Sequence, residues 1–252
     1  EEQNTRRAIF DGFRAAGMNK VTEDYMYSVL ADAFPIGNGR CQKKGVRHMQ
    51  CDACMARDGV HTQETTRHAH LECPHTEVVL VAMHLATHAA TATNQVELTR
   101  VRNLPTSDLA LEAKRALVTG VRIGDVANGS NTGGKPYTIL IGETHRALAE
   151  RRQRNALCEN MVKIDSDPAT LYTLVRTRMA NHVRWSLRAA EAESSKYRIS
   201  YPGWEQKDNG PLHDWETEWV KSGWVQDGKL NMPPTIHDIP GMAGRLGTGR
   251  VH

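Results

Sequence analysis

The sequence predicts a mostly α-helical fold in three parts: a small Cys/His-rich module, a helical domain and an extended C-terminal tail. Three observations predict this fold. Apolar residues recur at helical spacing in several segments, Pro and Gly separate those segments, and strand-like alternation is scarce. We expect the module with its flanking helices over residues 1–95, the helical region over 96–200, and a Trp-rich segment with a basic tail over 201–252.

The N-terminal part is predicted to hold two helices on either side of a basic loop. Thr22 can cap a helix over residues 22–34, which Pro35 ends. Residues 35–50 form the basic loop. Residues 76–93 are apolar and Ala-rich, which predicts the second helix.

The middle of the chain is predicted to hold three more helices. The first begins after Pro105 and runs to Val118, and a Gly- and Asn-rich loop follows over residues 120–136. A long helix then begins near Pro136. The last begins at Asp167-Pro168, and its expected apolar stripe consists of Tyr172, Val175, Met179, Val183 and Leu187.

The C-terminal part differs in composition. Pro211 can begin a short helix that Gly223 ends. Its aromatic residues could stack on nucleic-acid bases, but their spacing along one helix face favours core packing instead; they are Trp204, Trp215, Trp219 and Trp224. After residue 234 the chain has little periodicity and is expected to be an extended tail that orders against a partner.

Charge and hydropathy narrow the classes of function. The 252-residue chain has 32 Lys and Arg against 29 Asp and Glu, a formal net charge of +3. This mildly basic balance permits a nucleic-acid partner without demanding one. No apolar run approaches the ~18 residues of a membrane-spanning helix, so no membrane partner is expected. The chain begins with Glu1, so we expect a fragment or a processed product.

The strongest motif is a Cys/His pattern: Cys51-x2-Cys54, then thirteen residues, then His68-x4-Cys73. Zinc binds four soft or borderline ligands in a tetrahedron, and a set of four protein ligands leaves no position for water. The motif therefore predicts a structural zinc site that staples the module. His70 and His75 are rival ligands. Two unrelated thiols, or a degenerate site without metal, are the alternatives.

Residues 25–75 resemble a known family. The stretch CDACMARDGVHTQETTRHAHLECP is similar to the zinc-binding domain that follows the polymerase in reverse transcriptases of non-LTR retrotransposons. The shared pattern is C-x-x-C, a variable loop, E-T-x-x-H and a final Cys-Pro, which here are Cys51, Cys54, Glu64, Thr65, His68, Cys73 and Pro74. The resemblance implies contact with nucleic acid, either template RNA or target DNA.

Basic residues supply candidate phosphate contacts. One set surrounds the first ligand pair: Arg40, Lys43, Lys44, Arg47 and Arg57. A second set would form one phosphate-facing strip if its two helices pack together: Arg146, Arg151, Arg152, Arg154, Arg176, Arg178, Arg184 and Arg188. The alternative for both sets is a solvated surface.

The sequence does not support catalysis, and we expect no enzyme. A phosphate-loop-like run, Gly129 to Lys135, is followed by Pro136 where that motif needs Ser or Thr. The adjacent aspartates of a reverse-transcriptase active site are absent. Cys41 and Cys158 lack an obvious histidine base.

These observations lead to one hypothesis and two alternatives. The hypothesis is a non-catalytic, zinc-stabilised RNA-binding structural protein derived from a retroelement. It would serve with other proteins in a large ribonucleoprotein, such as an organellar (mitochondrial) ribosome. The alternatives are the template- or target-binding C-terminal region of an active reverse transcriptase, with DNA as a possible partner, and a protein–protein interaction module. Cysteines clustered with histidines indicate a metal site in a reducing intracellular compartment; the sequence does not identify the compartment, and it favours the mitochondrial matrix or the nucleus.

Overall fold

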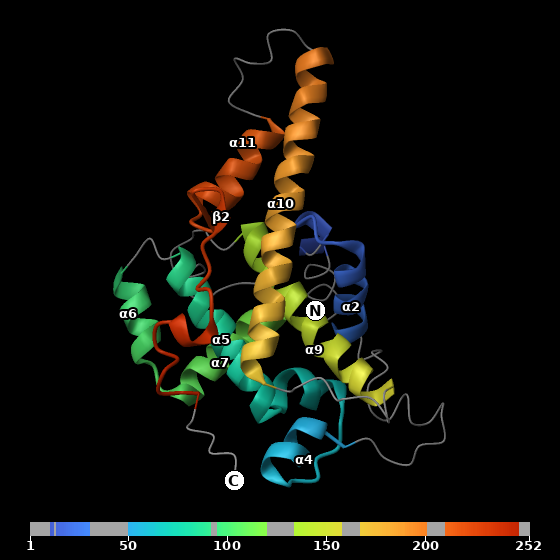
Figure 1. Ribbon diagram of the computed structural model, residues 1–252, viewed down its shortest axis with the longest axis vertical. Helices are drawn as coiled ribbons and strands as arrows, with labels where there is room; N and C mark the ends of the chain where they lie inside the picture. The colour runs from blue at the N-terminus through green and yellow to red at the C-terminus, as the bar shows by residue number, and fades with distance from the viewer. Residues whose placement is uncertain are drawn as a thin grey trace, which may run out of the picture.

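The described part of the computed structural model comprises residues 11–12, 14–30, 50–91, 95–119, 134–157, 167–200 and 210–246. These residues are mostly helical, which confirms the predicted fold class (Figure 1). The sheet within them is a single small hairpin, in which β1 (Val225–Gln226) pairs antiparallel with β2 (Lys229–Leu230).

Four long helices build the body of the protein: α5 (Pro74–Thr91), α7 (Thr106–Thr119), α9 (Gly134–Leu157) and α10 (Pro168–Ser200). Helix α10 follows the long axis of the molecule and packs against both α5 and α9 (Figure 1). Helix α5 also packs against α7, and the short α6 (Gln95–Asn103) lies beside it. Because it has neighbours on several sides, α5 is buried over most of its circumference.

The predicted apolar stripe of α10 faces this core. Tyr172, Val175, Met179 and Val183 are buried and Leu187 is partly buried. The same hydrophobic core extends from Ala16 to Met242, so it draws residues from all three segments of the sequence.

Helix α2 (Lys20–Leu30) lies closely against α9 because Gly142 has no side chain. A Cβ at Gly142 would come within 2.5 Å of Met18 Cε and 2.9 Å of Thr22 Cγ2. The Thr22 hydroxyl donates a hydrogen bond of 2.6 Å to Glu143 Oε1 on α9. Helix α2 is described as far as Leu30, so the predicted end at residue 34 and the loop up to residue 49 lie outside the described residues.

The Trp-rich segment packs against α10, as its spacing predicted. Helix α11 (Pro211–Trp215) continues into a wider turn, η3 (Glu216–Lys221), and Gly223 follows with a φ of +84°. Trp215, Trp219 and Trp224 are all buried. Trp204 lies outside the described residues.

The described segment after Pro234 consists of turns and irregular chain apart from η4 (Ile236–Asp238), as its low periodicity predicted, but it is not extended. It packs on the helices as far as residue 246, with Ile236, Ile239 and Met242 buried. The Tyr172 hydroxyl donates a 2.7 Å hydrogen bond to the carbonyl oxygen of Pro233. Arg245 Nη2 donates to the carbonyl oxygens of Arg102 and Leu104, at the end of α6.

Candidate metal centre

The first pair of ligand candidates comes from α4 (Asp52–Asp58). Cys51 precedes the first turn of this helix and Cys54 follows three residues later, so both thiols lie on one side. Helix α4 ends at Gly59, whose φ is +65°, and the chain then turns back. The Cys51 N–H donates a 2.8 Å hydrogen bond to the carbonyl oxygen of Thr62, which closes the loop.

The second pair comes from the next helical turn. Thr65 caps this turn, because its hydroxyl oxygen accepts a 3.0 Å hydrogen bond from the His68 N–H. The turn then widens into η1 (His68–Glu72), in which the Cys73 N–H donates to the His68 carbonyl oxygen at 2.8 Å. In an α-helix, side chains five residues apart would diverge by about 140°. The wider turn instead lets His68 and Cys73 face the same point.

The four side chains meet there with the separations of a metal tetrahedron. Cys73 Sγ lies 3.8 Å from the Sγ atoms of both Cys51 and Cys54, and Cys54 Sγ lies 3.5 Å from His68 Nε2. All four ligand atoms lie within 4.8 Å of one another. Zinc–sulfur bonds of about 2.3 Å and zinc–nitrogen bonds of about 2.0 Å place sulfurs about 3.8 Å apart and sulfur and nitrogen about 3.5 Å apart.

The chemistry of the cluster also fits a cation. All four residues are buried, and the three cysteines are not joined by disulfides, because the 3.8 Å from Cys73 Sγ to each of the other two sulfurs is well beyond the ~2.05 Å of a disulfide bond. Burial raises the pKa of the Cys54 thiol above its ordinary value. A divalent cation reverses that preference, because it stabilises the thiolate. The cluster can therefore hold a metal ion.

The two rival histidines occupy different positions. The ring of His70 is directed to α9, where its Nδ1 lies 2.9 Å from Nδ1 of His145. His75 Nε2 is 3.0 Å from Asp58 Oδ2, and these two atoms lie within 4.8 Å of Cys54 Sγ. His75 is thus the nearest replacement ligand, at the edge of the cluster, whereas His70 belongs to the contact with the helical body.

The cluster is joined directly to the core. The Cys73 carbonyl oxygen accepts 3.0 Å hydrogen bonds from the N–H groups of Thr76 and Glu77, so α5 starts at a ligand. The Thr76 hydroxyl donates back to the Ala69 carbonyl oxygen at 2.8 Å. η1 packs against both α5 and α9, and α4 lies at one end of the molecule (Figure 1).

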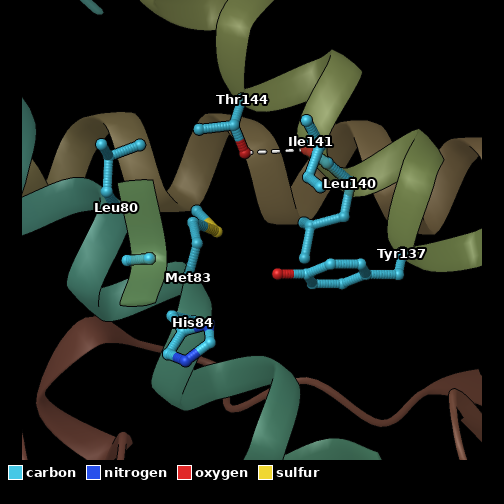
Figure 2. Close-up of a pocket in the computed structure, with 8 residues that line it drawn as sticks. Leu80, Met83, His84, Tyr137, Leu140, Ile141 and Thr144 are labelled. Carbon is cyan, nitrogen blue, oxygen red and sulfur yellow. Dashed lines mark hydrogen bonds between the residues drawn. The ribbon is translucent and has the colours of Figure 1, made fainter. Parts of the chain in front are cut away.

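A small, partly open pocket lies between α5, α7 and α9, with a cavity volume of about 20 Å³ (Figure 2). Apolar side chains such as Leu80 and Met83 line most of it. The Tyr137 ring points into it, and the Thr144 hydroxyl is committed to the Leu140 carbonyl oxygen at 2.8 Å. His84 also lines the cavity, with Nε2 3.6 Å from Glu112 Oε2. This set of side chains suits a trapped water better than a reaction.

The basic residues predicted to contact phosphates differ in their surroundings, and several of them lie outside the described part of the structure. Arg40, Lys43, Lys44 and Arg47, together with the side chains of Arg57, Arg152 and Arg154, lie outside the described residues. Arg146 and Arg178 both bind the carboxylate of Glu150, which joins α9 to α10. Their hydrogen bonds lower the pKa of Glu150 below its usual range, although burial alone would raise it.

Arg151 corrects one sequence expectation. Helices α9 and α10 do pack together, but Arg151 is 3% exposed and cannot be part of a phosphate-facing strip in this fold. The packing of α9 directs the Arg151 side chain inward, whereas the sequence predicted that it shares one exposed face with the neighbouring arginines. Arg176 is partly buried, with Nε 3.5 Å from the Met232 carbonyl oxygen. Arg184 and Arg188 are exposed on α10.

Trp185 was not among the residues predicted to bind nucleic acid, yet it is the exposed tryptophan among the described residues. A helical wheel would have found it, because it lies on the polar side of α10 with Arg184 and Arg188 rather than in the apolar stripe.

Comparison of the chain with protein-family models, with curated proteins and with solved structures finds no match. The fold and the cluster define a helical protein with a Cys3His metal-binding geometry. Among the described residues, no helix combines the length and the apolar character needed to cross a membrane.

Proposed function

We propose that this chain is a non-catalytic, zinc-stabilised RNA-binding structural protein, derived from a retroelement, that serves in a large ribonucleoprotein such as an organellar ribosome. The observation that carries the proposal is the buried cluster of Cys51, Cys54, His68 and Cys73, which supplies four protein ligands to one point. Four protein ligands leave no open position on the metal, so the site is suited to structure rather than catalysis.

Zinc is the metal that this donor set favours. Three thiolates and one imidazole are soft or borderline ligands, and the separations fit bonds of zinc length. Bound zinc would cross-link the 50–73 segment. The protein's own part is to hold the ligands: the Thr65 cap fixes the backbone of His68, and Cys73 is fixed by the start of α5.

The RNA part of the proposal rests on charge and on the resemblance. The chain is mildly basic, and its Cys/His segment is similar to a domain that contacts nucleic acid. Arg184 and Arg188 present cations at the surface of α10. Arginines on a rigid helix can contact phosphates without the entropic cost of ordering a loop.

Elemental analysis of the purified full chain tests the metal. We expect one zinc per chain. Cys54→Ser should abolish stoichiometric zinc, whereas the matched variant His75→Asn, which alters the neighbouring histidine, should keep it. Zinc retained by Cys54→Ser, or lost with His75→Asn, would contradict the ligand assignment.

Salt-dependent binding tests the RNA function. Fluorescence anisotropy with a labelled oligouridylate should show an affinity that falls steeply as salt rises, because phosphate contacts release counterions. An affinity that does not change with salt concentration would contradict the proposed RNA binding. Sequencing the RNA that co-purifies with the native protein tests the assembly: ribosomal RNA supports it, whereas a retroelement transcript or protein alone contradicts it.

A further inference from the structure

Trp185 occupies an unusual position on α10. Its side chain is 63% exposed, whereas Trp215, Trp219 and Trp224 are 8% exposed or less. A large apolar ring in water is unfavourable by the ordinary hydrophobic effect. Among the described side chains of α10, the other exposed large apolar residue is Leu174, eleven residues earlier, so Trp185 has no large exposed apolar neighbour within a turn of this helix.

The Trp185 ring packs beside His182, which in turn packs against a buried tryptophan. The His182 ring lies 5.8 Å from Trp185 and 5.8 Å from the buried Trp219. Burial lowers the pKa of His182 to about 4, so its imidazole is neutral near pH 7. One turn along, the Trp215 Nε1–H donates a 2.9 Å hydrogen bond to the Ser186 hydroxyl. These contacts fix this part of α10 against α11 and η3, and they hold Trp185 in a rigid part of the helix.

Two arginines lie near Trp185 on α10. Arg184 and Arg188 are four residues apart, and Trp185 is three residues from Arg188, so all three lie on one exposed face. Neither guanidinium has a carboxylate within ion-pair distance in the described part of the chain. In contrast, Arg100, Arg146 and Arg178 are all paired with glutamates.

We propose that Trp185, Arg184 and Arg188 form a binding platform for single-stranded RNA, in which a base stacks on the indole and the guanidiniums contact the adjoining phosphates. The inference deepens the proposed function and rests on it. Base stacking needs one exposed rigid aromatic face, and phosphates need unpaired cations beside it. A protein partner would favour several exposed apolar side chains, whereas Trp185 is the one large apolar side chain exposed near Arg184 and Arg188 among the described residues of α10.

Binding of a labelled oligouridylate by the full zinc-loaded chain tests the platform. Trp185→Ala should weaken binding five-fold or more, because loss of base stacking on an aromatic side chain costs at least that much. The slope of log affinity against log salt should not change, because no cation is lost. Trp185→Phe should restore most of the affinity. Leu174→Ala is the matched control and should bind as the wild type does.

The double variant Arg184→Gln/Arg188→Gln should behave differently. It should weaken binding and reduce the salt slope by about 1.4, which is about 0.7 for each phosphate contact on a single strand. The platform is wrong if the wild type binds oligouridylate and all these variants bind equally well, and in that case the RNA function still stands. If the wild type binds no RNA at any salt concentration, both proposals fail, and an interaction with protein becomes the better account of this face.

Discussion

His70 and His145 face each other through their Nδ1 atoms at 2.9 Å, in the buried layer between η1 and α9. One ring must donate and the other must accept, because two protonated or two unprotonated Nδ1 atoms would repel. His70 lies two residues after the ligand His68, so this bond is a direct link between the metal module and the helical body. The link joins residues 75 positions apart in the sequence.

Replacing one partner tests the strength of that link. His145→Ala should lower the free energy of unfolding by about 1–3 kcal/mol, because a buried hydrogen bond is lost and a small cavity remains. Zinc content should stay at one per chain, because no ligand is removed. Denaturant unfolding and elemental analysis measure the two effects, with the exposed His237→Ala as the control. Unchanged stability in His145→Ala would show that the contact contributes nothing.

The Thr65 cap should matter for metal affinity. Thr65→Ala removes the side-chain oxygen that accepts the His68 N–H, which costs about 1 kcal/mol of helix-start stability. Because the folded turn holds two ligands, that loss should appear as weaker zinc binding in a chelator competition. Thr65→Ser retains the hydroxyl and should bind as the wild type does. Equal zinc affinity in the Ala and Ser variants would show that the Thr65 cap does not contribute to metal binding.

Much of this arrangement could be predicted from the sequence. The four ligands follow from residue type and spacing, and the long helices follow from the 3.6-residue periodicity of segments such as Tyr172 to Val183. The widened turn at His68–Glu72 could not, because no local signal distinguishes it from an α-turn. The inward direction of Arg151 depends on how α9 packs against its neighbours, which is long-range information.

Removal of the metal should unfold the Cys/His-rich segment, residues 51–73, before it unfolds the main helical core. Within the module, the buried cluster around the thiols contains only Cys51, Ala53, Cys54 and Cys73, too few apolar groups to hold a fold without a cross-link. After chelation, hydrogen exchange should become fast for amides between residues 51 and 73. Amides near Met179 should stay protected, because they lie in the main hydrophobic core. Equal loss of protection in both regions would argue against this order.

His182 should contribute a pH dependence to stability. Its pKa is lowered by burial from 6.5 to about 4 in the folded state. The unfolded chain therefore binds a proton between pH 6.5 and 4 that the folded chain does not, and stability falls as the pH drops through this window. The loss from this residue can reach about 3 kcal/mol.

His182→Phe removes the titrating group and keeps a ring in the stack. Denaturant unfolding at both ends of the window should show a smaller acid-induced loss in this variant than in the wild type. The metal site also binds protons in acid, but it does so equally in both proteins, so the difference between them isolates His182. An identical loss in the two proteins would exclude His182 as the cause.

Arg245 and Tyr172 donate hydrogen bonds to backbone carbonyl groups far away in the sequence. These bonds limit how the protein can be truncated. A fragment that stops at residue 200 would lose the buried side chains of Ile236, Ile239 and Met242. The apolar helix surface that they cover would then be exposed to solvent. Such a fragment should aggregate rather than behave as a separable helical unit. Shortened versions should therefore keep the chain at least to Leu246, the last partly buried apolar side chain of the core among the described residues.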